Sequence, residues 1–195
     1  MTEPEAMPSN VVDRVCEWYE EMANEDDRII IIVGAGKLDE LVTHLLKSHM
    51  LHQGGGNDDL FGHDRPLGTF SSRILLAYRL GIISRDFESF LQTLRKLRNE
   101  AAHSSEKMDL SSSPRIQWIE HLFQLASKGA AWDRLFQSVP RVTPRESPRI
   151  ALMRCFLIAL FNCEAAVISA KPFTIEGVCN FNRFVAEIVS DEQSQ

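Results

Sequence analysis

One apolar segment near the C-terminal end of the chain limits how the chain can fold. Ser147-Pro148 is a typical helix start, because Pro fits the first helical position. Apolar residues then occupy nearly every side of the predicted helix, which runs to about residue 170: Ile150, Leu152, Met153, Phe156, Leu157, Ile158, Leu160, Phe161, Val167 and Ile168. Its length would suit a membrane span, but Arg154, Asn162 and Glu164 interrupt it. We interpret it as a central helix that other elements surround.

The remaining segments supply amphipathic helices to surround it. Helical spacing is seen over 10–25 (with Val12, Val15, Cys16 and Tyr19 inward), 71–81, 84–103, 113–125 and from Thr174 onward (with Val178, Phe181, Phe184, Val185 and Ile188 apolar). No convincing strand is present. The prediction is an all-α protein, a bundle of about six to eight helices around the apolar one. We expect residues 1–9 to form a flexible tail, 10–103 a helical core, and 104–195 a helical part packed on that core as one domain.

Residues 28–39 (RIIIIVGAGKLD) imitate the first strand and Gly-rich loop of a nucleotide-binding fold. That fingerprint needs a third glycine where Asp39 stands, and a parallel partner strand that the sequence does not offer. The alternative is one helix from about Asp27 to Met50, which would bury Ile30, Ile31, Val33, Leu38, Leu41, Val42 and Leu45. Gly34 and Gly36 would then mark places where another helix crosses closely. We favour the helix and keep nucleotide binding as a third functional hypothesis.

The charge balance and the cysteines narrow the function. The chain of 195 residues has a net charge of −6, which disfavours nonspecific binding to nucleic acid or anionic membrane. Its four cysteines show no CxxC spacing and are interpreted as reduced, mostly buried thiols. The first residues are polar and acidic, unlike a signal peptide. We expect a cytoplasmic protein without a membrane contact.

The segment Arg98-Asn99-Glu100-Ala101-Ala102-His103 closes the long helix over 84–103. Arg offers a rigid fork of donors, and His can transfer a proton near neutral pH, so the set suits phosphate or an acidic partner. Five positions separate Arg98 from His103, which places them about 140° apart around a straight helix. Arg98 is in phase with the apolar stripe, so we expect it to be buried against Asp39 or Glu40. For Arg73 we expect a structural pair with a carboxylate such as Asp39.

Several blocks between Asp27 and His103 resemble the mannitol operon repressor (MltR) family. They are Asp27-Arg28 with its apolar run, Leu38-Asp39-Glu40-Leu41, Leu60-Phe61-Gly62, Pro66-Leu67-Gly68-Thr69-Phe70-Ser71-Ser72-Arg73-Ile74, Leu76-Ala77-Tyr78-Arg79-Leu80-Gly81-Ile82-Ile83 and Leu97-Arg98-Asn99-Glu100-Ala101-Ala102-His103. The resemblance implies a helical domain with a role in transcriptional repression. No helix-turn-helix or basic recognition helix is evident. We therefore expect regulation through protein contacts rather than direct DNA binding.

The Arg-Asn-x-x-x-His string is also similar to the signature of HEPN domains, helical modules that often dimerise and are in many cases metal-independent ribonucleases. The resemblance carries over only to Arg98, Asn99 and His103. It implies His103 as general acid or base, Arg98 as stabiliser of phosphate charge and Asn99 as an orienting group, with two copies completing the site. Arg141, Arg145, Arg149 and Arg154 could extend a phosphate track.

Other candidate sites are weaker. His44, His49 and His52, with Asp58 and Asp59, could imitate a metal site, but histidines near a helix end are usually not ligands. We expect no metal and no cofactor. We expect the binding residues to be Asp39, Glu40, Arg73, Arg98 and His103. The expected partners are a protein, a second copy of the chain, or RNA if the ribonuclease hypothesis holds.

Overall fold

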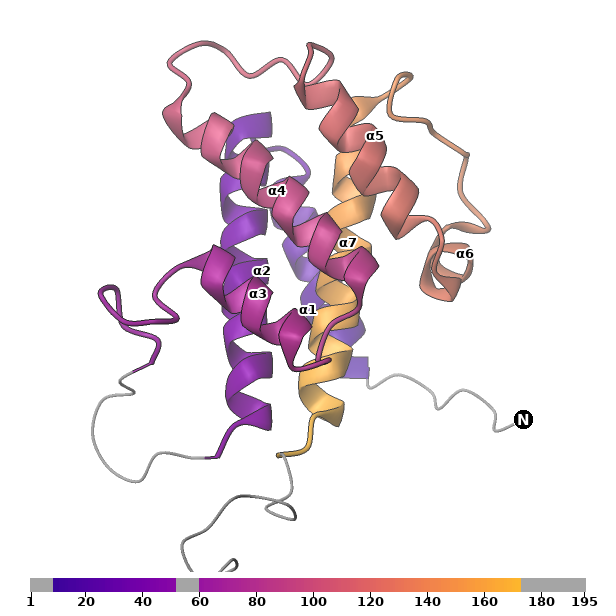
Figure 1. Cartoon of the computed structure of the whole chain (residues 1–195). Helices are drawn as coiled ribbons and strands as arrows, with labels where there is room; N and C mark the ends of the chain where they lie inside the picture. The colour runs from indigo at the N-terminus through magenta and orange to yellow at the C-terminus, as the bar shows by residue number, and fades with distance from the viewer. Residues whose placement is uncertain (1–8, 52–59, 173–195) are drawn as a thin grey trace, which may run out of the picture.

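The computed structural model describes residues 9–51 and 60–172, and within these ranges the chain forms seven α-helices and no strand (Figure 1). Their bounds are α1 Ser9–Met22, α2 Asp27–His49, α3 Phe70–Arg79, α4 Arg85–His103, α5 Arg115–Ala126, α6 Ala130–Phe136 and α7 Pro148–Ser169. The predicted all-α bundle is therefore confirmed. The predicted helix from Thr174 onward lies outside the described residues.

The core lies around α7, which contacts α1, α2 and α5. Half of its side chains are buried, from Ala151 to Glu164, and they point to several sides of the helix. By length and composition α7 could cross a membrane, yet 61% of its most apolar window is buried within the bundle. The one buried acid, Glu164, accepts a hydrogen bond from Arg14 of α1 at 2.7 Å. The apolar segment thus serves as the centre of the described bundle, as its sequence predicts.

The segment that imitates a nucleotide-binding loop lies inside α2. Asp26 caps this helix by accepting a hydrogen bond from the backbone N–H of Arg28 at 2.8 Å. A Cβ atom at Gly34 would lie 2.6 Å from the ring of Phe156, so the glycine lets α7 cross closely. No heavy atom comes within 4 Å of such an atom at Gly36. The strand-and-loop interpretation of this segment is wrong. The explanation by a close helix crossing holds for Gly34 but not for Gly36.

Two predicted inner faces differ from the observed ones. In α1 the buried stripe contains Val11, Val15, Trp18 and Met22, whereas Val12 and Cys16 are exposed. The prediction is therefore wrong by about one position, because a short segment with apolar residues on adjacent positions fits two stripes. In α2, Val33 is 41% exposed although its neighbours in the predicted set are buried. It points away from α7.

The helix ends follow local capping rules, with shifts of one or two residues. Thr69 caps α3 through a reciprocal capping box with Ser72, so α3 begins one residue before the predicted range 71–81. Gly81 has φ of +70° and ends that helix region, and Ser84 caps α4, in agreement with the limits of the predicted ranges 71–81 and 84–103. Pro114 is the residue before the first helical residue of α5, so this helix begins two residues after the start of the predicted range 113–125.

The short helix α6 is absent from the sequence-based prediction. Trp132 on this helix contacts Phe123 of α5 edge to face, with ring centroids 4.8 Å apart, and Phe136 at 4.7 Å. The contact with Phe123 joins α6 to α5 and helps to hold a helix that is too short to be stable alone. The local sequence pattern does not contain this information.

Candidate functional site

The candidate site lies on the last turns of α4. Ser84 accepts a hydrogen bond from the backbone N–H of Phe87 at 3.2 Å and fixes the start of the helix. A stripe of Phe90, Leu94, Leu97 and Ala101 is buried and fixes its rotation. This stripe determines which side chains of the hexapeptide can face outward.

Arg98 and His103 are both exposed, and Asn99 is half-buried. The Arg98 guanidinium donates a long hydrogen bond of 3.4 Å to Oδ1 of Asn99. The helix continues without a break to His103, so Arg98 and His103 remain about 140° apart around its axis. One copy of the chain does not bring the two side chains together.

The predicted burial of Arg98 against Asp39 or Glu40 is wrong. Within residues 9–51 and 60–172, Arg98 forms no ion pair, and Glu40 pairs instead with Lys37 at 3.3 Å. The cause is that the centre of the buried stripe passes through Leu97 and Ala101, which leaves Arg98 at its flank.

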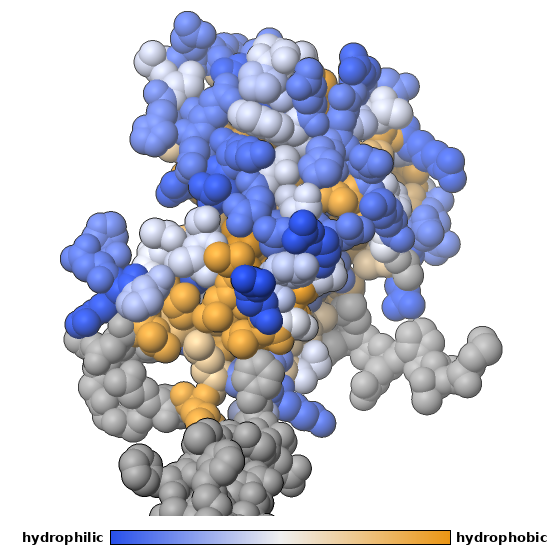
Figure 2. Space-filling model, in the orientation of Figure 1, coloured by the Kyte–Doolittle hydropathy of each residue, from blue (hydrophilic) through white to orange (hydrophobic). Residues whose placement is uncertain are grey.

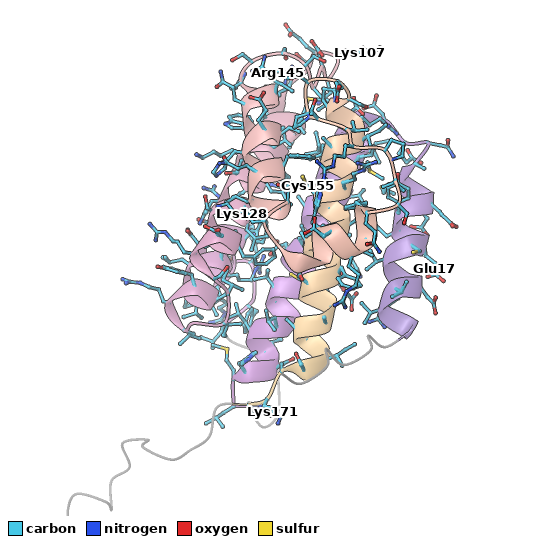
Figure 3. The ribbon with its side chains drawn as sticks, turned by 90° about the vertical axis from the view of Figure 1, so that its right-hand side faces the viewer. Glu17, Lys107, Lys128, Arg145, Cys155 and Lys171 are labelled. Atoms are coloured by element: carbon cyan, nitrogen blue, oxygen red, sulfur yellow. The ribbon has the colours of Figure 1, made fainter. Side chains whose placement is uncertain are left out.

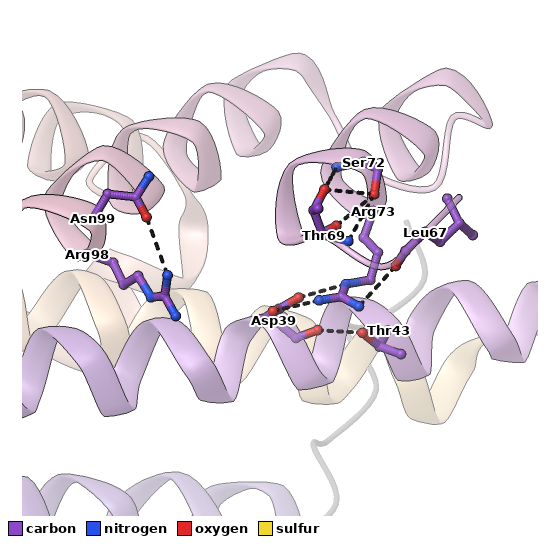
Figure 4. A network of polar contacts seen from close by, with 8 residues as sticks. All are labelled: Asp39, Thr43, Leu67, Thr69, Ser72, Arg73, Arg98 and Asn99. Atoms are coloured by element: carbon purple, nitrogen blue, oxygen red, sulfur yellow. Dashed lines mark hydrogen bonds and ion pairs between the residues drawn. The ribbon is translucent and has the colours of Figure 1, made fainter. Parts of the chain in front are cut away.

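Asp39 is bound by Arg73, as the sequence predicts (Figure 4). The guanidinium donates two hydrogen bonds of 2.8 Å, one to each carboxylate oxygen, and a third of 3.1 Å to the carbonyl of Leu67. A two-point pair of this kind fixes both position and orientation. Arg73 therefore joins α3, α2 and the segment before α3.

The pKa of the Asp39 carboxyl is raised above its ordinary value, and burial is the main cause. The hydrogen bonds and charge of Arg73, and the charge of Arg98, act in the opposite direction without cancelling the effect of burial. Arg98 thus influences Asp39 through space, although Arg73 is its bonded partner.

The segment before α3 is built for tight packing. A Cβ atom at Gly68 would lie 2.4 Å from the carbonyl oxygen of His63 and 2.5 Å from that of Gly62, so only glycine fits there. Leu67 is buried, and its backbone N–H donates to the carbonyl of Leu60 at 2.8 Å. Together with Arg73 and the Thr69 cap, these contacts give the residues of the Pro66–Ile74 block structural roles.

Two residues that the sequence reasoning left without a role hold the end of α4. Arg28 of α2 donates to the carbonyls of Ala101, Ser104 and Glu106, the first at 2.6 Å. Arg115 of α5 donates to Glu100 at 2.7 Å. The last carbonyls of a helix have no hydrogen-bond partner within it and need donors from elsewhere. This need could have suggested that arginines such as Arg28 bind the end of α4.

Next to this end, α2 carries an exposed strip of small and apolar residues. Ile29 and Val33 are each 41% exposed, and Gly36 is exposed on the same side of the helix. Ile29 directly follows Arg28, which is bonded to the end of α4. We call Ile29, Val33 and Gly36 the outer strip. It lies on the same helix as Arg28, which holds the end of α4.

Three of the four arginines in the predicted phosphate track bind other groups of the same chain. Arg145 pairs with Glu120 at 2.6 Å, Arg149 pairs with Asp27 at 2.6 Å, and Arg154 donates to the carbonyl of Pro140 at 3.0 Å. Arg149 also donates to the carbonyls of Ala23 and Glu25, beyond the end of α1. These contacts give the three arginines structural roles.

The histidines and cysteines do not form a site among the described residues. In residues 9–51 and 60–172, no three His, Cys, Asp or Glu side chains are grouped so that they could hold a metal ion. His52, Asp58 and Asp59 of the predicted cluster lie outside these ranges. Burial raises the pKa of the Cys163 thiol to about 12, and it raises that of Cys155, on the central helix in Figure 3, still further. Cys16 is exposed, and Cys179 lies outside the described residues.

Comparison of the chain with protein-family models, with curated proteins and with solved structures gives no match. A function is therefore inferred from the geometry of the end of α4 and from the sequence resemblances described above.

Proposed function

We propose that this chain is a regulatory protein that acts through protein–protein contacts. The role that we infer is transcriptional repression of the kind associated with the mannitol operon repressor family, in the cytoplasm and without direct contact to DNA. The observation that supports it best is the surface at the end of α4. There Arg98 and His103 are exposed, and neither takes part in an ion pair within the described residues, while the neighbouring helix α2 exposes the outer strip.

The composition of this surface fits a protein partner. A protein interface combines an apolar centre with polar and charged groups at its edge, and Arg is enriched there. Ile29 and Val33 provide apolar contacts, while Arg98 offers donors to an acidic side chain. The partner that suits this surface is an acidic protein face or a second copy of the chain.

The test measures self-association and partner binding of single variants of the full chain. Light scattering would follow the dimer, and titration calorimetry would follow a partner isolated from the source cells. We expect Arg98→Glu and Val33→Asp each to weaken binding at least tenfold, about 1.4 kcal/mol. Arg79→Glu, at an exposed arginine of α3, is the matched control and should leave binding unchanged. Equal binding of all variants would refute this surface.

The second candidate function is a metal-independent endoribonuclease, and one observation favours it. Arg98 and His103 are both exposed, as a reaction at a contact between two copies would require. His103 would take the proton of a ribose 2′-hydroxyl, whose oxygen attacks phosphorus to form a 2′,3′-cyclic phosphate. The bond from phosphorus to the 5′-oxygen breaks, and this oxygen takes a proton from water. Arg98 of the other copy would bind the charged phosphate oxygens.

RNA cleavage in the presence of a chelator tests this candidate. If it is correct, His103→Ala should lower the rate by about 10² to 10⁴. His63→Ala, at another exposed histidine, should have no effect. The absence of cleavage by the wild-type chain, or equal cleavage by both variants, would exclude the enzyme.

A further inference from the structure

An apolar groove runs along α7 toward its C-terminal end. It consists of two adjoining hollows of about 130 and 260 Å³, which share Ser84, Phe87 and Asn162 as lining residues. The first reaches back along α7 to Ile158, and the second reaches forward to Ala166. The lined stretch is about 12 Å long, or two turns of helix. Figure 2 shows apolar side chains gathered on the neighbouring surface, over α3 and the turn after it.

Asn162 is the polar exception on the α7 side of this groove. Ile158, Ala159 and Cys163, which share its side of the helix, are buried, whereas Asn162 is exposed. Its side chain forms no hydrogen bond with any residue of 9–51 or 60–172. An amide placed among apolar neighbours suits a partner that also offers an amide.

The chain beyond α7 contains a segment that matches the groove. Pro172 ends the helical path and Thr174 is a suitable cap, so the sequence predicts a helix over 175–189, about 22 Å long. One side of it is apolar: Ile175, Val178, Phe181, Phe184, Val185, Ile188 and Val189. The other side carries Glu176, Arg183 and Glu187. Asn182 is the one polar residue within the apolar side.

We propose that residues 175–189 fold back antiparallel to α7 and fill this groove. A short connection after α7 makes an antiparallel neighbour the expected arrangement. Asn162 lies seven residues before Ser169, the last residue of α7. Asn182 lies seven residues after Ile175, the first residue of the predicted helix. The two amides are therefore level with each other in such a hairpin and can exchange hydrogen bonds. The apolar side of the segment then covers Phe87 and Ile158.

The segment of the same chain is favoured over a second copy because it starts beside the groove. Ala170 follows the last residue of α7, and Ala166 lines the groove one turn earlier. A tether this short gives an effective concentration in the millimolar range, which a second copy does not reach at ordinary protein concentrations.

Disulfide trapping in the full chain tests the register. Cys16 and Cys179 are first replaced by Ser, so that only the buried Cys155 and Cys163 remain. Asn162→Cys with Asn182→Cys should form an intramolecular disulfide under mild oxidation, and urea should abolish its preferential formation. Asn162→Cys with Asn180→Cys, on the polar side of the segment, is the matched control and should not form it. Equal trapping of both pairs, no trapping, or disulfide-linked dimers would overturn the proposal.

A second measurement does not depend on engineered cysteines. Phe181→Asp should uncover the groove, lower the Tm and increase the fluorescence of a dye that binds apolar surfaces. Arg183→Asp introduces the same side chain on the polar side and should change neither. The proposal fails if the two substitutions have equal effects.

Discussion

The two sides of α2 differ in what covers them. The inner side, with Gly34 and Leu38, is closed by α7, and Phe156 lies so near that it leaves no room for a side chain at Gly34. The outer strip of Ile29, Val33 and Gly36 is exposed and has space beside it. The same helix thus holds the fold together on one side and leaves small and apolar residues exposed on the other. Substitutions on the first should change stability, and substitutions on the second should change binding.

The largest expected effect is that of Gly34→Leu. The new side chain would occupy the space of the Phe156 ring, so we expect a loss of about 3 kcal/mol or more in the free energy of unfolding. Gly36→Leu should instead increase stability by up to about 1 kcal/mol, because leucine favours the helix and has room there. Urea unfolding measures both. Similar losses at the two positions would contradict the contrast between the sides of α2.

A somewhat smaller effect is expected for Arg73→Met. It removes both hydrogen bonds to Asp39 and leaves this carboxylate, with 27% of its side chain exposed, without its partner. We expect a loss of about 2 kcal/mol, less than for a fully buried pair. Arg98→Met should change the free energy of unfolding by less than about 0.5 kcal/mol, since Arg98 is exposed. An equal loss in both variants would restore the buried Arg98 that the sequence predicts.

The stability of the Arg73→Met variant should depend on pH in a defined direction. Burial already raises the pKa of Asp39, and the substitution removes the main influences that lower it. With a raised pKa, the folded chain holds the proton more tightly than the unfolded chain. The deficit relative to wild type should be smallest below pH 3.8 and should grow as the pH rises through the folded pKa. Unfolding curves across acidic pH measure this, and Asp39→Asn in the same background should remove the dependence.

The smallest effect on stability is expected on the outer strip. Val33→Ser should change the free energy of unfolding by less than about 0.5 kcal/mol, because Val33 is largely exposed. Ile30→Ser, at a buried position of the same helix, is the control and should cost several times more. A loss at Val33 as large as at Ile30 would show that another part of the chain covers the outer strip.

Much of the architecture could be predicted because it depends on periodicity and local signals. The central helix α7, the cap at Ser84, the turn at Gly81 and the pair of Arg73 with Asp39 are all readable from spacing and residue type. The orientation of Arg98 could not be predicted. It depends on the rotation of α4 about its axis, and this rotation is determined by which of two adjacent apolar rows is buried. That choice depends on neighbouring helices and not on α4 alone.

The residues that bind the carbonyls at helix ends and connections could not be predicted from the sequence either. Arg28 and Arg149 reach helix ends and connections far away in the chain, and any arginine could have served. The same holds for α6, whose aromatic contacts with α5 replace a strong helical pattern. Contacts between distant segments decide these features, and a single sequence does not list them.

The reactivity of the two buried thiols of α7 reports whether the helix bundle has opened. Only the thiolate attacks an alkylating reagent, and Cys155 and Cys163 are kept protonated and covered as long as α7 is enclosed. Exposed Cys16 on α1 should react at once, whereas modification of Cys163 should wait until helices separate from α7. The delay between the two reactions would time the separation of the bundle without any label added to the protein.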